Sequence, residues 1–393
     1  MSIDRRQFML SLVASGAVLS LPGLSLAAAP TDRRFVFVIL RGGMDGLAAI
    51  PPYADPAYAA ARGALALPSS AYLDLNGFFG LNAALSPLND FYRKGEMLAL
   101  QAVHSPYRER SHFDGQDVLE GGGTAPHRTH DGWLNRTLSA IDKPEAMAIG
   151  QNVPLALRGE VPVASWAPSP LTGLSQDMAK KLAGMYSGDQ LFSMALEEGM
   201  QSEAFVAGTL GEDMEMKMGG KAKDFVKLAE AAGKLMAAAT GPRVAMLELG
   251  GWDTHTGQGT EGGRIAEPLS RLANGIVALA QGLGQIWANT VVVAVSEFGR
   301  TVAANGTGGS DHGTAGAALV LGGAVKGGRV IVDWPGLAKE KLYQGRDLAP
   351  TLDLRSLLKG LLRDHLGVAK TALDSLIFPD STAIPALEGL LRR

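Results

Sequence analysis

The stretch of sequence that decides the fold is Val-Ala-Met-Leu-Glu-Leu-Gly-Gly-Trp-Asp-Thr-His, residues 244–255. An apolar run bounded by paired glycines predicts a buried strand, and Asp253 and His255 follow it directly. Ligand-binding groups of open α/β sheets lie just outside the carboxyl ends of the strands. One carboxylate and one imidazole at such a position suit zinc, manganese or iron. Taken alone, the pair also fits an ordinary polar turn after a strand.

Three further apolar runs carry charged or imidazole side chains at one end. They are residues 35–40 before Asp45, residues 291–295 before Glu297 and Arg300, and residues 317–321 after Asp311 and His312. Each loop alone says little, because surface loops are usually polar. Four such loops at one edge of a sheet predict a metal cluster. The expected cofactor is zinc or manganese, with one or two ions per chain, and the predicted ligands on these loops are Asp45, Asp253, His255, Glu297 and His312.

A charged segment, residues 104–120, follows another predicted strand, Met97 to Val103. Ser111 precedes an acidic residue by three positions, a pattern typical of the start of a helix. Ser111 is therefore either a helix cap or a nucleophile, because a helix amino terminus stabilises an anionic hydroxyl. In the second case Arg110 would bind the non-bridging oxygens of a phosphate or sulfate ester. His112 would lie close enough to act as a metal ligand or an acid.

The amino terminus predicts export. Paired arginines, Arg5 and Arg6, precede an apolar stretch from about residue 8 to residue 26, which ends in the small-x-small sequence Ser25-Leu26-Ala27. This order is typical of a secretory signal, and the paired arginines indicate the twin-arginine route. We expect residues 1–27 to be a signal peptide, with an uncleaved signal anchor as the alternative. The mature protein would then be periplasmic or otherwise exported, with no stable membrane span.

Composition limits the classes of partner. The chain has 36 basic and 39 acidic residues and a net charge of −3, which offers no basic stripe for nucleic acid. It has no cysteine, so any metal must be held by carboxylate, imidazole, hydroxyl or water. A hydrophobic content of 46% supports a large core. The expected partner is a small anionic ester substrate or another protein of the cell envelope.

Strand-like and helix-like segments alternate over residues 31–140 and again from residue 242, which predicts an α/β fold. Residues 144–172 are interrupted by proline and are predicted to be extended. Residues 174–238 are rich in Met, Ala, Lys and Glu and predict a helical insertion between the two halves of the sheet. Residues 265–283 predict a long amphipathic helix.

Together these motifs resemble those of an exported sulfatase-like family, domain of unknown function 1501. The motifs are the twin-arginine start, Arg-Gly-Gly-Met-Asp-Gly, Arg-Ser-His-Phe-Asp, Gly-Gly-Trp-Asp-Thr-His, Ser-Glu-Phe-Gly-Arg-Thr and Gly-Ser-Asp-His-Gly-Thr-Ala. The family is similar to the alkaline phosphatase superfamily. The resemblance implies one three-layer domain over residues 31–393, with a mainly parallel central sheet and two metal ions at its carboxyl edge. It implies metal ligands at Asp45, Asp253, His255 and His312, and a further acidic group at Glu248.

The sequence departs from the superfamily pattern at two points. Phe298 stands where a second-site histidine is expected, so His112 would have to replace it or that site would be weak. The superfamily nucleophile has no unambiguous counterpart, and Ser111 is the best candidate by position. The candidate catalytic residues are Ser111, Arg110 and Arg300. Two functions are therefore expected: a metal-dependent exported hydrolase of phosphate or sulfate esters, or a non-catalytic metal-binding or assembly protein of the envelope.

Overall fold

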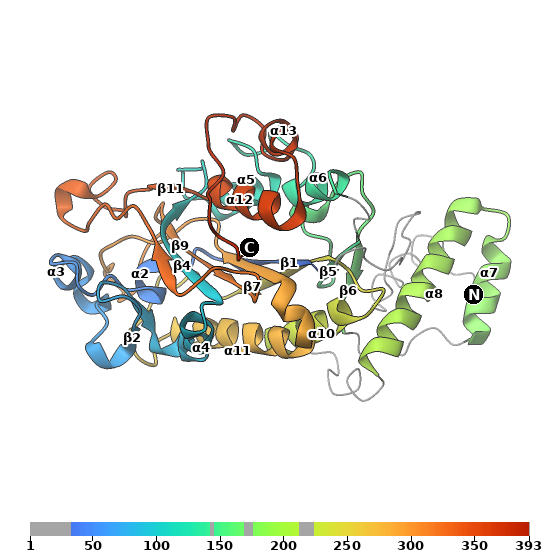
Figure 1. Ribbon diagram of the computed structural model, residues 1–393, viewed down its shortest axis with the longest axis horizontal. Helices are drawn as coiled ribbons and strands as arrows, with labels where there is room; N and C mark the ends of the chain where they lie inside the picture. The colour runs from blue at the N-terminus through green and yellow to red at the C-terminus, as the bar shows by residue number, and fades with distance from the viewer. Residues whose placement is uncertain (1–32, 142–144, 169–175, 212–223, 393) are drawn as a thin grey trace.

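The computed structural model describes residues 33–141, 145–168, 176–211 and 224–392. The predicted signal peptide lies outside these residues. The described chain forms a three-layer α/β domain in which helices cover both faces of a central sheet (Figure 1). The predicted fold class, with its mainly parallel sheet, is confirmed. In this part of the chain, no helix is both long enough and apolar enough to span a bilayer.

Nine of the strands in the described residues form the central sheet. They are β1 (Arg34–Arg41), β4 (Met97–His104), β5 (Ala146–Ile149), β6 (Ala164–Trp166), β7 (Val244–Gly250), β8 (Thr290–Val295), β9 (Gly316–Leu321), β10 (Arg329–Ile331) and β11 (Leu352–Asp353). Their order is β10-β4-β9-β8-β1-β7-β5-β6, with β11 also paired to β4. A separate two-stranded sheet pairs β2 (Tyr72–Asp74) with β3 (Gly80–Asn82).

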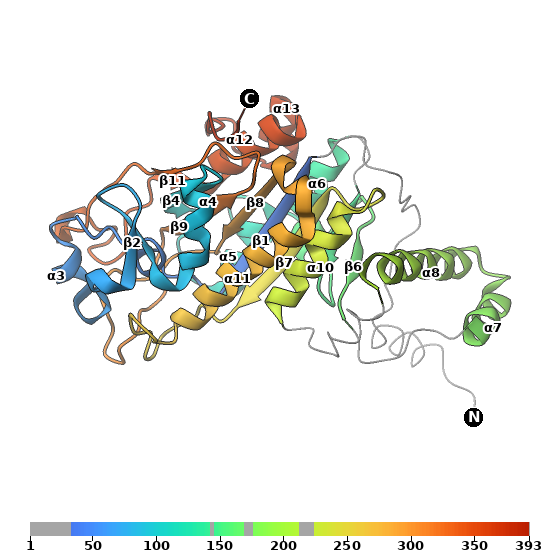
Figure 2. The ribbon, with the colours of Figure 1, turned by 60° about the horizontal axis from the view of Figure 1, so that its bottom comes forward.

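The described residues form helices of very different lengths. They are α2 (Gly46–Ala49), α3 (Tyr58–Arg62), α4 (Asn89–Arg93), α5 (His112–Gly121), α6 (Trp133–Ser139), α7 (Gln176–Tyr186), α8 (Gln190–Leu210), α10 (Phe225–Ala237), α11 (Ala266–Leu283), α12 (Leu354–Leu366) and α13 (Lys370–Ala372). Helices α4, α10 and α11 cover one face of the sheet, and α5, α6 and α12 cover the other (Figures 1 and 2). Helices α7 and α8 project beyond β6.

Strand β1 lies at the centre of the sheet, and its sequence has no polar side because both of its faces are buried. Its side chains alternate between two hydrophobic cores. Val36, Val38 and Leu40 face the core that includes α10 and α11. Phe35, Phe37 and Ile39 face the core of α6 and α12, where Trp133 packs edge-on against Phe37 with ring centroids 5.1 Å apart. The central strand is thus held from both sides, which gives the loop that follows it a rigid base.

One edge of the sheet collects the loops that carry the predicted site. Strand β1 is parallel to β7 and β8, so their carboxyl ends meet there. Strand β9 runs antiparallel to its neighbours β4 and β8, so its amino end lies at that same edge. Residues that precede β9 therefore lie beside residues that follow β1, β7 and β8. Because β9 is antiparallel to both β4 and β8, β4 runs in the same direction as β8. The start of α5, which follows β4, therefore lies at the same edge.

The predicted strands at 35–40, 97–103, 244–250, 291–295 and 317–321 and the helix at 265–283 are all present. Residues 144–172 were predicted to be extended, and they include β5 and β6, but the prediction is wrong at Leu155–Leu157, which form a single 3-10 turn after Pro154. Within the predicted insertion at 174–238, α10 packs against α11 as part of the layer on the sheet. Helices α7 and α8, in contrast, project from the body of the domain.

Candidate metal centre

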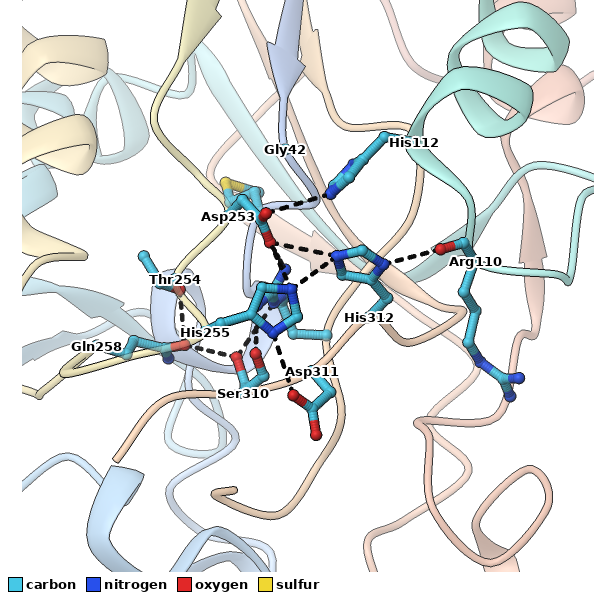
Figure 3. A network of polar contacts seen from close by, with 12 residues as sticks. Gly42, Arg110, His112, Asp253, Thr254, His255, Gln258, Ser310, Asp311 and His312 are labelled. Carbon is cyan, nitrogen blue, oxygen red and sulfur yellow. Dashed lines mark hydrogen bonds and ion pairs between the residues drawn. The ribbon is translucent and has the colours of Figure 1, made fainter. Parts of the chain in front are cut away.

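Asp253 lies at the centre of the polar cluster, on the loop after β7 (Figure 3). The loop is anchored by Trp252, whose side chain is fully buried and whose Nε1 donates to the Leu249 carbonyl at 2.8 Å. It also packs closely against the loop after β1, since a Cβ built on Gly42 would lie 2.8 Å from the Asp253 nitrogen. The positive φ of Gly42, 122°, is accessible only to glycine. The position of Asp253 is therefore set by both strands.

Three imidazoles converge on the Asp253 carboxylate. Its Oδ1 lies 3.0 Å from His255 Nε2 and 3.2 Å from His312 Nε2, and its Oδ2 lies 3.6 Å from His112 Nε2. His112, Asp253 and His312 each offer one ligand atom, and these atoms all lie within 4.8 Å of one another. Two imidazoles and one carboxylate are ligands typical of a catalytic zinc site. The side chain of Asp253 is 44% exposed, so the cluster opens to solvent.

The opposite nitrogen of each imidazole is held by a protein acceptor. His112 Nδ1 lies 2.7 Å from Glu297 Oε1, and His255 Nδ1 lies 3.1 Å from Asp311 Oδ1. His312 Nδ1 lies 2.8 Å from the Arg110 carbonyl. We assign the proton of each neutral ring to Nδ1, because acceptors of this kind fix the tautomer. The Nε2 lone pairs then point towards Asp253, as metal ligation requires.

Arg300 binds Oδ1 of Asp253 at 2.6 Å, but it leaves the three imidazole Nε2 atoms without a donor of their own. His112 Nε2 is buried and has no hydrogen-bond partner, and the Nε2 atoms of His255 and His312 lie only 2.9 Å apart. Two neutral rings with protonated Nδ1 atoms would place lone pairs against each other at this distance. A buried polar atom without a partner is costly. A cation held by His112, Asp253 and His312 would give these nitrogens a partner, so the residues present fit a metal ion.

The pKa shifts of His312 and Asp253 favour their metal-binding forms, whereas that of His112 favours its protonated form. Burial lowers the pKa of His312, which keeps that ring neutral and available as a ligand. The hydrogen bond from His112 to Glu297 raises the pKa of His112. Burial alone would raise the pKa of Asp253, but the hydrogen bond and charge of Arg300 outweigh it and lower that pKa. Asp253 is thus held as a carboxylate.

Glu297 was predicted as a ligand, and the structure places it behind His112. Its side chain is fully buried. Its Oε1 accepts from the Gly42 nitrogen at 2.9 Å, from His112 and from Gln116 Nε2 at 3.2 Å, while Ser296 donates to its Oε2 at 3.0 Å. A carboxylate in this position orients the histidine and increases its basicity. Glu297 thus supports the centre through His112.

Asp45 was also predicted as a ligand, and it is not one of the three residues whose ligand atoms lie together. Its Oδ1 accepts from the backbone nitrogens of Leu47 and Ala48, which makes Asp45 the cap of α2. Its Oδ2 pairs with Arg62 at 2.6 Å and with Gln258 at 2.5 Å. Both carboxylate oxygens are therefore engaged with protein donors.

The candidate catalytic residues have different surroundings. Ser111 is the residue before α5, but its hydroxyl makes no capping bond. The Arg110 guanidinium points away from the cluster (Figure 3) and pairs with Asp347 at 2.7 Å, while its carbonyl holds His312. Arg300 is buried and donates to Asp253 at 2.6 Å and to Ser310. The Ser111 side chain instead hydrogen-bonds to Tyr107, and both arginines are occupied.

We compared the sequence of the chain with known protein families. Residues 95–377 match the family described as a protein of unknown function, DUF1501. The chain belongs to the DUF1501 family. The matched residues include His112, Asp253, His255 and His312, and leave Asp45 outside. No curated protein matches the DUF1501 chain.

Solved structures resemble the DUF1501 chain at low sequence identity. One is the crystal structure of Ps i-CgsB in complex with k-i-k-neocarrahexaose, with a TM-score of 0.45 and 11% identity over 90% of this chain and 76% of that chain. Another is the PsFucS1 sulfatase from Pseudoalteromonas sp., with a TM-score of 0.36 and 13% identity over 76% of this chain and 64% of that one.

A cleft of about 1010 Å³ opens at the same edge of the DUF1501 domain. Arg41 lies in it and pairs with Glu120 at 2.9 Å and with Glu248 at 2.5 Å. Glu248 therefore belongs to the cleft, not to the imidazole cluster. Phe113, next to His112 in the chain, lines the cleft and is 88% exposed. Gln116 joins the two features, since it contacts both Arg41 and Glu297.

Several important contacts in this DUF1501 protein had no signal of their own in the sequence. Arg62 lies at the end of α3 and pairs with Asp45. Gln258 and Gln116 are amides without a motif, yet each contacts a carboxylate near the cluster. Asp311 is adjacent to His312 in a glycine-rich loop, and that adjacency could have marked it as the partner of a histidine.

Proposed function

We propose that this protein is a metal-dependent hydrolase of phosphate or sulfate esters, with the ion held by His112, Asp253 and His312. One observation carries the proposal: three imidazoles turn Nε2 towards Asp253 while a protein acceptor holds each Nδ1. This is the arrangement of a metal site whose ligands are already oriented. Zinc suits two imidazoles and one carboxylate best, with manganese as the alternative. His255 adjoins the set as a fourth candidate ligand.

When bound, the ion would polarise a non-bridging oxygen of the ester and stabilise the charge of the transition state. The residues of the chain have separate tasks. Arg300 keeps Asp253 charged and in place. Ser111 offers the one predicted nucleophile, and its hydroxyl is free of a capping bond. The net reaction consumes one water and releases an alcohol and an inorganic phosphate or sulfate ion.

The cleft beside the cluster would bind the alcohol part of the ester. Its arginine, Arg41, is already paired with two carboxylates, so it offers little attraction to a second anion. The exposed ring of Phe113 gives an apolar surface at the rim. Such a mixture of one aromatic ring and a few polar groups is usual in sites for small organic ligands.

The proposal is tested on the mature protein with a panel of phosphate and sulfate esters, before and after treatment with a chelator. Turnover should disappear with the metal and return when zinc or manganese is added. Ser111→Ala should retain the metal and the fold but lose turnover. Ser375→Ala is the matched control, because its hydroxyl bonds only to the Thr371 carbonyl. Full turnover by Ser111→Ala would remove Ser111 as the nucleophile.

A second function, a non-catalytic metal-binding or assembly protein of the envelope, is favoured by one observation. Arg110, the predicted clamp for the ester, pairs with Asp347 and Gln344 and points away from the cluster. Stoichiometric metal with no turnover on either class of ester would support this function over hydrolysis.

We also propose export by the twin-arginine route, on the basis of Arg5 and Arg6. Replacing both with lysine should leave the precursor in the cytoplasm, which cell fractionation measures. Normal export of that variant would contradict the route.

A further inference from the structure

We infer that the centre binds one metal ion per chain, because the side chain of Arg62 takes the place of a second cation beside Asp45. This inference rests on the proposed metal-dependent function and specifies its stoichiometry. It differs from the expectation of two ions that the family resemblance carries.

The first step is the saturation of Asp45. Its Oδ1 accepts two backbone hydrogen bonds at the start of α2, at 3.0 and 3.1 Å. Its Oδ2 accepts from Arg62 at 2.6 Å and from Gln258 at 2.5 Å. The residue is only 1% exposed, so water does not compete for these oxygens. An ion at Asp45 would have to displace these donors from buried positions.

The second step is the fixed position of the Arg62 charge. Arg62 is fully buried at the end of α3. Its other terminal nitrogen donates to the carbonyls of Val302 at 3.0 Å and Thr301 at 3.3 Å. A guanidinium remains charged at every accessible pH. A divalent ion beside Asp45 would therefore meet a permanent like charge in a buried setting, where such repulsion is strong.

The third step concerns the space between Asp45 and Asp253. Gln258 bridges it with neutral hydrogen bonds, since its Oε1 accepts from Thr254 at 2.8 Å and from Ser310 at 2.5 Å. Arg300 binds Oδ1 of Asp253. Each aspartate thus has an arginine, but Asp45 is buried with both oxygens engaged, whereas Asp253 is 44% exposed and its Oδ2 faces His112. Among the described residues, His112, Asp253 and His312 are the one set of three acidic or histidine side chains close enough together to hold an ion.

The test is the ratio of metal to protein. The full mature chain is saturated separately with zinc and with manganese, dialysed, and measured by elemental analysis against protein concentration. We expect one ion per chain. A ratio of two would overturn the inference and leave the metal-dependent function standing. A ratio of zero would overturn the metal-dependent function itself.

Two variants locate the ion. Asp45→Asn keeps the size and the capping oxygen, so the ratio should stay at one while the melting temperature falls because Arg62 loses its carboxylate. Loss of the ion from folded Asp45→Asn, with folding checked by circular dichroism, would overturn the inference. If that single variant does not fold, Asp45→Asn combined with Arg62→Met removes both buried charges together and should also bind one ion. Asp364→Asn, an exposed aspartate paired with its neighbour Arg363, is the matched control.

Discussion

Two aspartates on adjacent loops of this domain have opposite surroundings. Asp45 follows β1 and Asp253 follows β7, and these strands are parallel neighbours. Asp45 is buried and saturated by Arg62, Gln258 and the start of α2. Asp253 is partly exposed and faces three imidazoles. Two aspartates at neighbouring strand ends therefore differ in their capacity to bind a metal, because the side chains that contact them come from distant parts of the chain.

The largest expected effect concerns Asp253. Asp253→Asn keeps the size of the side chain but removes the charge at the centre, so the variant should lose its metal. A bound metal stabilises the folded protein by about 3–4 kcal/mol when its free concentration is about 100 to 1,000 times its Kd, and the variant should lose this stabilisation. Thermal unfolding with and without added zinc measures this difference. A variant stabilised by zinc as strongly as the parent would show that Asp253 is not a ligand.

The next largest expected effect is a loss of folding stability at acid pH, caused by a buried histidine outside the centre. His365 on α12 is buried, and its Nε2 donates to the Arg34 carbonyl at 2.9 Å. Burial lowers the pKa of His365 to about 4 from 6.5. As the pH falls, His365 is protonated in the unfolded chain before it is protonated in the folded protein. The free energy of unfolding should therefore decrease by about 3 kcal/mol between about pH 6.5 and about pH 4.

His365→Gln removes this titration. Denaturant unfolding at pH 7 and pH 4.5 should therefore show a smaller acid loss in the variant than in the parent. An equal loss in both proteins would mean that His365 is not the cause.

The next effect in size concerns Glu297, which contacts the cluster only through His112. Glu297→Gln removes the charge that orients this imidazole, so metal affinity should fall by about 10–100-fold. Competition with a zinc-binding dye measures the change. The variant should still reach the parent ratio of metal to protein at high zinc. A permanent loss of the ion would instead make Glu297 a direct ligand.

Much of the fold follows from local patterns in the sequence. The apolar runs that became β1, β7, β8 and β9 are buried on both faces and lack polar alternation, which marks them as central strands. The 3.6-residue spacing of Leu269, Leu272 and Ile276 predicted α11, and these residues are buried. The segment after Pro154 was misread because a short apolar run does not distinguish a strand from a 3-10 turn.

The candidate site was only partly predictable. Asp253, His255 and His312 sit next to glycines and strand ends, so their loops were visible in the sequence. The roles of Asp45 and Glu297 were not, because each role depends on a partner far away in the chain. Arg62 forms an ion pair with Asp45, and His112 forms a hydrogen bond with Glu297.

The sequence by itself determined the strands, the main helices and the loops that carry the chemistry, because hydrophobic periodicity and glycine placement are local properties. Only the tertiary structure decided which side chains meet. The antiparallel direction of β9 brought His312 to the edge where β7 ends, and the start of α5 brought His112 to Asp253. Packing also placed a buried arginine beside Asp45. These contacts join residues far apart in the chain, and their energies depend on burial and charge that appear only when the core has formed.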